Sequence, residues 1–530
     1  MKKIIIGAAL LSVMGLSCRK GFLDINHNPN DATVSKPELI LSNALVATGG
    51  EVDNPLGNFS FISGWMGYIA ISGSYAINNA DFTTYKQTAD FGEGIWQTQY
   101  DNIADYDYVA KQSTVTGQNF YKGIGLIMRS FNYQILVDLF NNIPYTEALQ
   151  GAVNLHPRYD DASTIYGDLF KRIDTAMILI RSAVDPILGP LPTADLMFAK
   201  AYPNDNPLTT AHFTIVKNLW LQFANTLKLR MLLRLSEMAT KPSYFASELN
   251  IVANDASGFL TVDATVNPGY LNTAGKLSPF YGANYSATGT YTNDFWRANA
   301  FAIFFYQIHN DPRISRVYST VVVNNNPIYV GNTLGIAGAV GSASSIFGPG
   351  VLSGYNQDVV IMLAAESYFI QAEAAARGWI NGDPLTLYNQ GVTESFRYLG
   401  VPNYSFAAIT YTGQAGDTLT NMTTRNTVQQ KVHLIIAQKW IAENMINVFE
   451  PYCDYRRFVN PGATYPGTTT IQRPLGFLNF GPPYAISQSP NVDLRAIPYR
   501  LEYPRSELNT NSTNVPTGID HHTSKIFWMP

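Results

Sequence analysis

The sequence predicts a mainly α-helical fold, in which pairs of helices form a scaffold for long irregular loops. Apolar residues recur every three or four positions, as on one face of a helix. The segments with this spacing are 35–48, 97–111, 117–140, 163–183, 213–235, 359–400 and 427–449. The stretches between them are polar and aromatic: 49–90, 186–210, 255–297, 318–357, 401–426 and 459–524. Loops this long usually carry function, and helical pairs that recur without a fixed period favour a helical-repeat scaffold.

The first helix is expected to begin at a capping box in "SKPE". In this motif the side chains of Ser35 and Glu38 would bond free backbone N–H groups of the first turn, where Pro37 is tolerated. Helical spacing then continues through Leu41, Ala44, Leu45 and Thr48. The folded part of the chain should therefore start near residue 35.

A long amphipathic helix is expected over residues 213–235. Its apolar stripe consists of Phe213, Val216, Trp220, Phe223, Leu227, Met231 and Leu235. Lys228, Arg230 and Arg234 lie off this stripe, so the pattern predicts that one face of the helix is in water.

Two antiparallel helices are expected within residues 359–400. Gly378 ends the first helix, and Asp383 followed by Pro384 begins the second, which ends before Gly400. The apolar stripes are Met362, Ala365, Phe369, Ala372 and Ala376 in the first helix, and Tyr388, Val392 and Phe396 in the second.

The composition indicates a folded protein with a neutral, aromatic surface. Hydrophobic residues make up 46% of the chain and charged residues only 14%, well below the usual quarter, whereas aromatic residues reach 13%. The formal net charge is -4 and no long basic run occurs, which argues against nucleic acid as a partner.

The N-terminus resembles the signal peptide of an exported lipoprotein. Lys2 and Lys3 precede the apolar stretch "IIIGAALLSVM", which is too short to span a bilayer, and "GLSC" places small residues before Cys18. We expect residues 1–17 to be removed and Cys18 to be lipidated. Ordinary secretion is the alternative interpretation.

Residues 23–33, "LDINHNPNDAT", begin with the spacing of a calcium loop, because Asp24, Asn26 and Asn28 alternate. The sixth position, normally glycine, is Pro29, and the twelfth, normally a carboxylate, is Ser35. The pattern therefore excludes an EF-hand, and no metal site is predicted. Residues 18–34 are interpreted as a polar, extended tether to a single domain at 35–530.

The sequence favours a binding protein over an enzyme. It contains no G-x-S-x-G, H-E-x-x-H, Walker or Rossmann signature, and no cofactor is predicted. Cys453 lies in "EPYCDYRRF", where neighbouring arginines could activate a thiol, but a small packed residue in a helix-terminal turn is the preferred interpretation. For His521 and His522 a surface or linker position is preferred to a metal site.

Two loop segments have the composition of a sugar-binding site. Sugars offer apolar C–H faces to aromatic rings and hydroxyl groups to polar side chains, so both residue types are needed together. The candidate ligand-binding residues are Trp65, Tyr68, Tyr75, Asn78, Asp81 and Tyr85 in the first segment, and Tyr281, Tyr291, Asn293, Asp294 and Trp296 in the second. Core packing is the competing interpretation for each single ring.

Several motifs together resemble the SusD/RagB lipoproteins of Bacteroidetes. They include "FLDINHNPNDAT", "GIWQTQYDNI", "MRSFNYQILVDLFNNIPYTEAL", "WLQFANTLKLRMLLRLSE", "AAESYFIQAEAAARGWINGDPLTLYNQGV" and "RAIPYRLEYPRSELNTN". The resemblance runs from residue 18 to the C-terminus. It implies a tetratricopeptide-like α-helical scaffold with ligand-binding loops.

The resemblance also implies the function. Such a protein is an outer-membrane, surface-exposed and non-enzymatic lipoprotein that captures a glycan and passes it to a SusC-like TonB-dependent transporter for import. Two alternatives stay open from the sequence: a peptide or glycoprotein ligand within the same transport system, and a glycoside hydrolase, for which two facing carboxylates would be needed.

Overall fold

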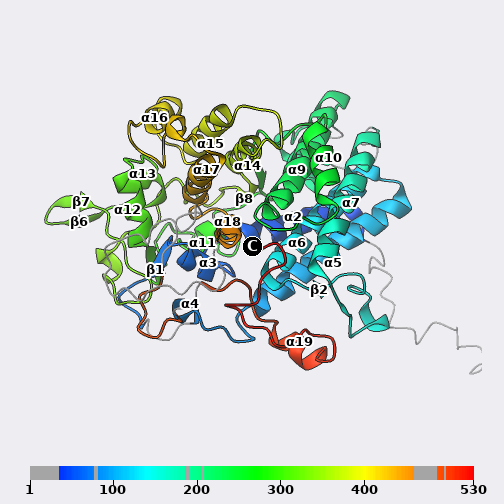
Figure 1. Cartoon of the computed structure of the whole chain (residues 1–530), viewed down its shortest axis with the longest axis horizontal. Helices are drawn as coiled ribbons and strands as arrows, with labels where there is room; N and C mark the ends of the chain where they lie inside the picture. The colour runs from blue at the N-terminus through cyan, green and yellow to red at the C-terminus, as the bar shows by residue number, and fades with distance from the viewer. Residues whose placement is uncertain (1–34, 77–80, 185–190, 206–207, 459–485, 494–496) are drawn as a thin grey trace, which may run out of the picture.

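The computed structural model describes residues 35–76, 81–184, 191–205, 208–458, 486–493 and 497–530, and helices dominate it (Figure 1). The helices are α2 (Pro37–Val52), α3 (Ser60–Trp65), α4 (Asp81–Thr84), α5 (Glu93–Thr116), α6 (Asn119–Phe140), α7 (Ala162–Ser182), α8 (Leu191–Ala194), α9 (Thr210–Arg234), α10 (Phe245–Asn254), α11 (Pro279–Gly282), α12 (Ala300–Ile308), α13 (Ile314–Val317), α14 (Ala364–Ala376), α15 (Pro384–Tyr398), α16 (Tyr404–Thr412), α17 (Val428–Ala442), α18 (Phe449–Phe458) and α19 (Arg505–Thr510). The predicted mainly α-helical class is confirmed.

The strands are short and pair in antiparallel twos. They are β1 (Ile69–Ile71) with β5 (Trp296–Ala298), β2 (Ile143–Pro144) with β3 (Tyr159–Asp160), β4 (Ala264–Val266) with β8 (Val359–Met362), and β6 (Val321–Val323) with β7 (Asn326–Ile328). Strands β1, β4 and β8 are entirely buried and belong to the core, whereas β6 and β7 are largely exposed.

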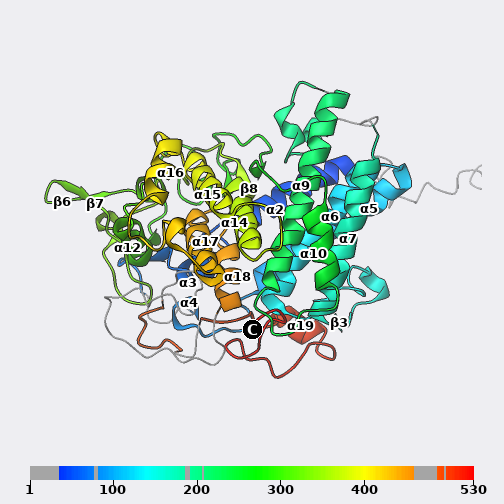
Figure 2. The ribbon, with the colours of Figure 1, turned by 45° about the horizontal axis from the view of Figure 1, so that its top comes forward.

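The helices form two groups that meet at the centre of the molecule (Figures 1 and 2). In the first group α2, α5, α6, α7 and α9 pack against one another in succession, and in the second group α14 packs against α15 and α17. Helix α9 contacts α14 and joins the groups. This arrangement of neighbouring antiparallel helices is the helical-pair scaffold that the sequence predicts.

In helix α2 the predicted apolar face is confirmed, whereas the predicted N-terminal cap is absent. Leu41, Ala44, Leu45 and Thr48 are fully buried. The residue that precedes the helix is Lys36, and no side chain caps it, so the expected capping box of Ser35 and Glu38 is wrong. Ser35 lies one position too early, because Pro37 already occupies the first helical turn.

The predicted hairpin at 359–400 is largely confirmed. Gly378 and Gly400 follow the two helices with φ angles of +72° and +68°, which favour glycine, and Asp383 caps α15 by accepting a hydrogen bond from Thr386 N (3.0 Å). Residues 359–362, however, form strand β8 rather than the start of a helix. The expected helix at 427–449 is also divided, because α17 ends at Ala442 and α18 begins at Phe449.

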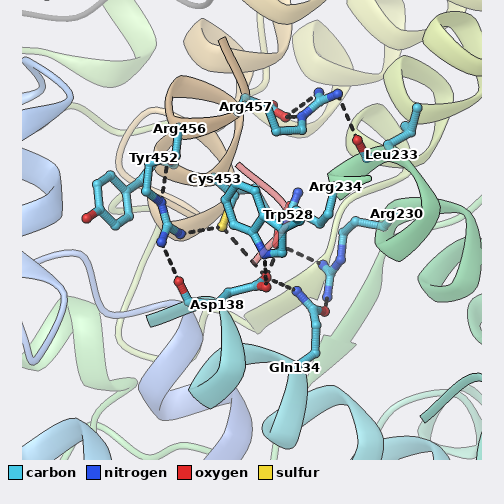
Figure 3. A network of polar contacts seen from close by, with 12 residues as sticks. Gln134, Asp138, Arg230, Leu233, Arg234, Tyr452, Cys453, Arg456, Arg457 and Trp528 are labelled. Carbon is cyan, nitrogen blue, oxygen red and sulfur yellow. Dashed lines mark hydrogen bonds and ion pairs between the residues drawn. The ribbon is translucent and has the colours of Figure 1, made fainter. Parts of the chain in front are cut away.

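The polar face of α9 does not lie in water. Lys228, Arg230 and Arg234 are all buried, so the predicted wet face is wrong. Arg230 Nη2 donates to Gln134 Oε1 (3.0 Å) (Figure 3). Arg234 Nη2 lies 2.6 Å from Glu450 Oε2. Carboxylates and amides from α6, α7, α10, α14 and α18 therefore replace the water that the amphipathic pattern suggested.

Asp138 on α6 connects this network to the C-terminus. Its Oδ2 accepts a hydrogen bond from Arg234 Nε (3.2 Å), and its Oδ1 accepts one from Trp528 Nε1 (2.7 Å) (Figure 3). Removal of one of these donors would leave a buried polar group without a partner, which costs more free energy than the hydrogen bond itself contributes. The network thus ties α6, α9 and the last residues of the chain together.

Cys453 and the histidine pair also lie inside the structure. Cys453 is buried within α18 rather than in a helix-terminal turn, so that part of the expectation is wrong. Burial raises the pKa of its thiol to about 12, although Arg456 Nη2 lies 3.1 Å from Sγ, which favours the packed residue over the activated thiol. His522 is buried, and Nε2 of both His521 and His522 lies 3.1 Å from Tyr85 O, which corrects the expected surface position.

The described helices include none that is both long and apolar enough to cross a membrane. The predicted signal peptide at 1–17, the lipidation site Cys18 and the tether at 18–34 lie outside the described residues.

Candidate ligand-binding surface

Strands β1 and β5 bring the two predicted sugar-binding segments together. Their register pairs Ile71 with Trp296, and Ser72 N continues the pairing by donating to Phe295 O (2.8 Å). The loop after β1 therefore lies beside the loop before β5. Segments that are far apart in the sequence are fixed as neighbours by backbone hydrogen bonds, which place side chains more precisely than free loops would.

Aromatic rings from both segments form one cluster. The ring centroids of Tyr75 and Phe295 lie 5.0 Å apart, those of Phe295 and Trp296 lie 4.6 Å apart, and those of Phe82 and Trp296 lie 5.6 Å apart. Tyr75 is 42% exposed, whereas the other three are partly buried. The cluster thus holds Tyr75 at the surface on a support of packed rings.

Asp294 and Arg297 form an ion pair beside this aromatic cluster. Arg297 Nη2 lies 2.6 Å from Asp294 Oδ1, and the side chain of Asp294 is 55% exposed whereas that of Arg297 is 3% exposed. Arg297 also donates from Nε to Gly341 O (3.1 Å) and from Nη1 to two backbone carbonyls, those of Asn293 (2.8 Å) and Trp296 (2.7 Å). The buried guanidinium therefore fixes the exposed carboxylate in place.

A third loop segment, residues 338–341, lies against the same place. Gly73 N donates to Ala339 O (3.0 Å), and Gly341 N donates to Ser74 Oγ (3.3 Å). A Cβ at Gly341 would lie 2.1 Å from Asp294 Oδ1, so only glycine allows this approach. We call the surface formed by Tyr75, Phe295, Trp296 and Asp294, with Arg297 and Gly341 behind it, the aromatic–carboxylate surface.

Three tyrosines extend this region. The rings of Tyr281 and Tyr285 stack with centroids 5.0 Å apart, Tyr285 contacts Tyr291 edge to face at 5.2 Å, and the Arg297 guanidinium lies 5.9 Å from the centre of the Tyr291 ring. All three tyrosines are partly buried. Burial raises the pKa of Tyr291, so its phenol stays protonated at neutral pH.

Asn293 has a positioning role in this structure. It is buried, and its Oδ1 accepts hydrogen bonds from Phe295 N (3.2 Å) and Trp296 N (3.0 Å), while its Nδ2 donates to Asn284 Oδ1 (2.9 Å). These bonds shape the turn that presents Asp294 and Trp296.

Three of the predicted rings lie in the core. Trp65 Nε1 donates to Phe82 O (2.8 Å), the Tyr68 hydroxyl donates to Trp440 O (2.6 Å), and the Tyr85 hydroxyl accepts from Ser487 N (2.8 Å). Each ring is at most 1% exposed, so the expectation that these three are open to a ligand is corrected. Their polar atoms are satisfied inside the protein, which is how buried Trp and Tyr residues are usually accommodated.

The remaining predicted residues of the first segment are Asp81 and Asn78. Asp81 is partly buried at the start of α4, and burial raises the pKa of its carboxyl group. Asn78 lies outside the described residues.

Sequence reasoning missed Phe82, Phe295, Arg297 and Gly341. Phe82 and Phe295 lie within the predicted segments, but only the strand pairing shows that they support the exposed ring.

Chemically, the aromatic–carboxylate surface suits a sugar. An exposed ring can stack on apolar C–H groups, and a fixed carboxylate can accept hydrogen bonds from hydroxyl groups. Among the described residues, no group of three or more His, Cys, Asp or Glu side chains is arranged to hold a metal ion.

The chain belongs to the SusD-like family, whose model, described as "Starch-binding associating with outer membrane", matches residues 29–471. This confirms the resemblance seen in the sequence and places the protein in a family of nutrient-binding proteins that associate with the outer membrane.

Solved structures show the same fold at low sequence identity. A chitin-binding SusD homologue from Flavobacterium johnsoniae is 21% identical, with a TM-score of 0.68 and 92% and 98% of the two chains covered. A SusD-like protein from Bacteroides thetaiotaomicron is 21% identical, with a TM-score of 0.67 and coverage of 92% and 98%. A SusD homologue from Bacteroides ovatus is 19% identical, with a TM-score of 0.68 and coverage of 92% and 99%. Among the curated proteins compared, none matches the chain.

Proposed function

We propose that this protein captures an oligosaccharide or polysaccharide at the cell surface, without hydrolysing it, and passes it to a SusC-like TonB-dependent transporter for import. The family supports binding at the outer membrane. The single observation that carries the proposal for this chain is the aromatic–carboxylate surface, where the exposed Tyr75 ring packs on Phe295, the residue that follows the exposed Asp294.

The N-terminal part of the proposal rests on the sequence. Residues 1–17 act as the signal peptide, Cys18 carries the lipid, and residues 18–34 form the tether to a domain at 35–530. A polar tether rich in Asn and Pro lets a lipid-anchored domain stand away from the membrane. The domain then faces the cell exterior, where the glycan and the mouth of the transporter are both accessible.

At the site, Tyr75 supplies the stacking surface and Asp294 supplies an acceptor. Within the described part of the chain Asp294 Oδ2 has no hydrogen-bond partner, whereas Oδ1 is bonded to Arg297. Tyr291 and Trp296 contribute further ring surface, and Tyr281 and Asp81 lie on the adjoining elements. Weak affinity is expected, because a shallow polar site gains little after its desolvation and ordering costs.

The experiment is affinity electrophoresis of the full-length protein, purified in detergent, through gels that contain starch, chitin derivatives, mannan or xylan. We expect retardation by at least one neutral glycan, and a loss of affinity of about tenfold in Tyr75→Ala. Tyr404→Ala is the matched control, because Tyr404 is similarly exposed (39%) but lies on α16, away from this surface. Equal loss in both variants, or no retardation by any glycan, would contradict the proposal.

A further inference from the structure

At the aromatic–carboxylate surface the negative charge is exposed to solvent and the positive charge is buried. The acidic partner of the ion pair, Asp294, is the exposed one, and the basic partner, Arg297, is buried. A ligand at this surface therefore meets a carboxylate first. Its nearest cation lies behind that carboxylate and is already paired with it.

Arg297 has little capacity left for an anionic ligand. Its side chain makes four hydrogen bonds, three to backbone carbonyls and one to Asp294. A guanidinium has five N–H donors, so nearly all of them are used within the protein. The Tyr291 ring lies 5.9 Å from the same guanidinium, and the loop at Gly341 contacts it from another side.

The position of Asp294 is also fixed. Gly341 comes so close that a Cβ there would lie 2.1 Å from Asp294 Oδ1 and 3.0 Å from Arg297 Nη2. Glycine at position 341 thus leaves the room that this carboxylate occupies, and rotation of the carboxylate away from its place would break its bond to Arg297. A carboxylate held in this way accepts hydrogen bonds from hydroxyl, amide or ammonium groups, and it repels another carboxylate or a sulfate.

We propose that Asp294 is the specificity-determining residue of this surface, and that it selects neutral or amino-bearing glycans against acidic ones such as uronic-acid polymers. This inference rests on the proposed function and deepens it. Arg297 acts through Asp294 as a positioning residue.

The test compares each neutral polymer with its own carboxymethyl derivative, so that the backbone is the same and only the charge differs. Starch, glycol chitin, mannan and xylan are the probes, and the gels are run at low ionic strength because salt screens exposed charges. The variants are Asp294→Asn, which keeps an oxygen for the Arg297 bond, and Asp101→Asn, an exposed residue on α5 that changes the net charge equally.

We expect the wild-type protein to bind the neutral polymer more tightly than its carboxymethyl form. The ratio of the two affinities should fall by at least about threefold in Asp294→Asn, as expected for one charge a few ångströms away in water. The ratio should not change in Asp101→Asn.

The outcomes separate the two proposals. Preference for the carboxymethyl polymers, or an equal ratio in wild type and Asp294→Asn, would overturn the selectivity of Asp294 and leave glycan binding standing. Retention by none of the neutral or acidic polymers would overturn both.

Discussion

The Tyr75 ring meets the Phe295 ring edge to face, with centroids 5.0 Å apart and planes at 71°. This contact joins the loop after β1 to the loop before β5, and it gives the exposed tyrosine a rigid support. A rigid ring loses less entropy when it stacks on a sugar. We therefore expect the affinity for a glycan to depend on the rigidity of these two loops as well as on the exposed ring.

The close approach of Gly341 to Asp294 leads to the first prediction. Gly341→Ala should weaken glycan retention by about tenfold, because the new Cβ would displace Asp294 and disturb its bond to Arg297. Gly354→Ala is the matched control, since the atom that its Cβ would meet is Asn356 Oδ1 at 3.4 Å. Affinity electrophoresis measures both. Unchanged retention in Gly341→Ala would show that the position of Asp294 does not matter for binding.

The buried network at the centre of the fold leads to the second prediction. Arg234→Met should lower the free energy of unfolding by about 3–5 kcal/mol, because Glu450 and Asp138 would lose a buried partner. In contrast, Arg505→Met should change stability little, since Arg505 and Asp90 are both largely exposed. Urea unfolding followed by tryptophan fluorescence compares the two. A similarly small decrease in the free energy of unfolding for both variants would mean that the buried network contributes little to stability.

The third prediction concerns Glu51, at the end of α2. Burial raises the pKa of its carboxyl group to about 7, and the hydrogen bonds from Asn58 Nδ2 to Oε1 and Oε2 (both 3.0 Å) offset this only in part. The folded state therefore holds a proton more tightly than the unfolded state, in which the pKa is near 4.5. The stability contributed by this proton is complete below about pH 4.5 and is lost as the pH rises through about 7.

Glu51→Gln should remove this pH dependence. The free energy of unfolding of the wild-type protein should fall between about pH 5 and about pH 8 by up to about 3 kcal/mol more than that of the variant. Urea unfolding at several pH values gives the difference, with Asp101→Asn as the exposed control. Parallel pH profiles for wild type and Glu51→Gln would contradict the assignment.

The fourth prediction concerns Cys453. Because burial raises the pKa of this thiol to about 12, iodoacetamide should not alkylate it in the native protein at neutral pH. In urea the same residue should react fully. Mass spectrometry of the peptide that contains Cys453 distinguishes it from Cys18. Rapid modification of the native protein would restore the activated thiol as a candidate.

The fifth prediction separates binding from hydrolysis. Incubation of the protein with any glycan that it retains should release no reducing ends. Release that is abolished by one carboxylate substitution would instead establish a glycoside hydrolase.

The helical scaffold could be predicted from the sequence because its signals are local. Apolar spacing marks each helix, and Gly378 and Gly400 mark two of the ends. The burial of Arg230 and Arg234 could not be predicted in the same way. Periodicity separates the apolar face of α9 from its polar face, but it does not show that Glu450, far along the chain, covers the polar face instead of water.

The candidate surface was predictable as a pair of segments but not ring by ring. Trp65 and Tyr75 stand in the same polar and aromatic stretch, yet Trp65 is buried and Tyr75 is exposed. The difference arises because Trp65 lies on α3, which packs into the core, whereas Tyr75 follows β1, where the chain reaches the surface. Arg297 and Gly341 gave no local signal, since their roles depend on the approach of a third loop.

The most direct test of the central claim is a crystal structure of the protein with an oligosaccharide of the glycan that it retains. The account predicts a sugar ring stacked on Tyr75, with a hydroxyl or amide group donating to Asp294. A sugar bound at another surface, with the aromatic–carboxylate surface empty, would contradict it.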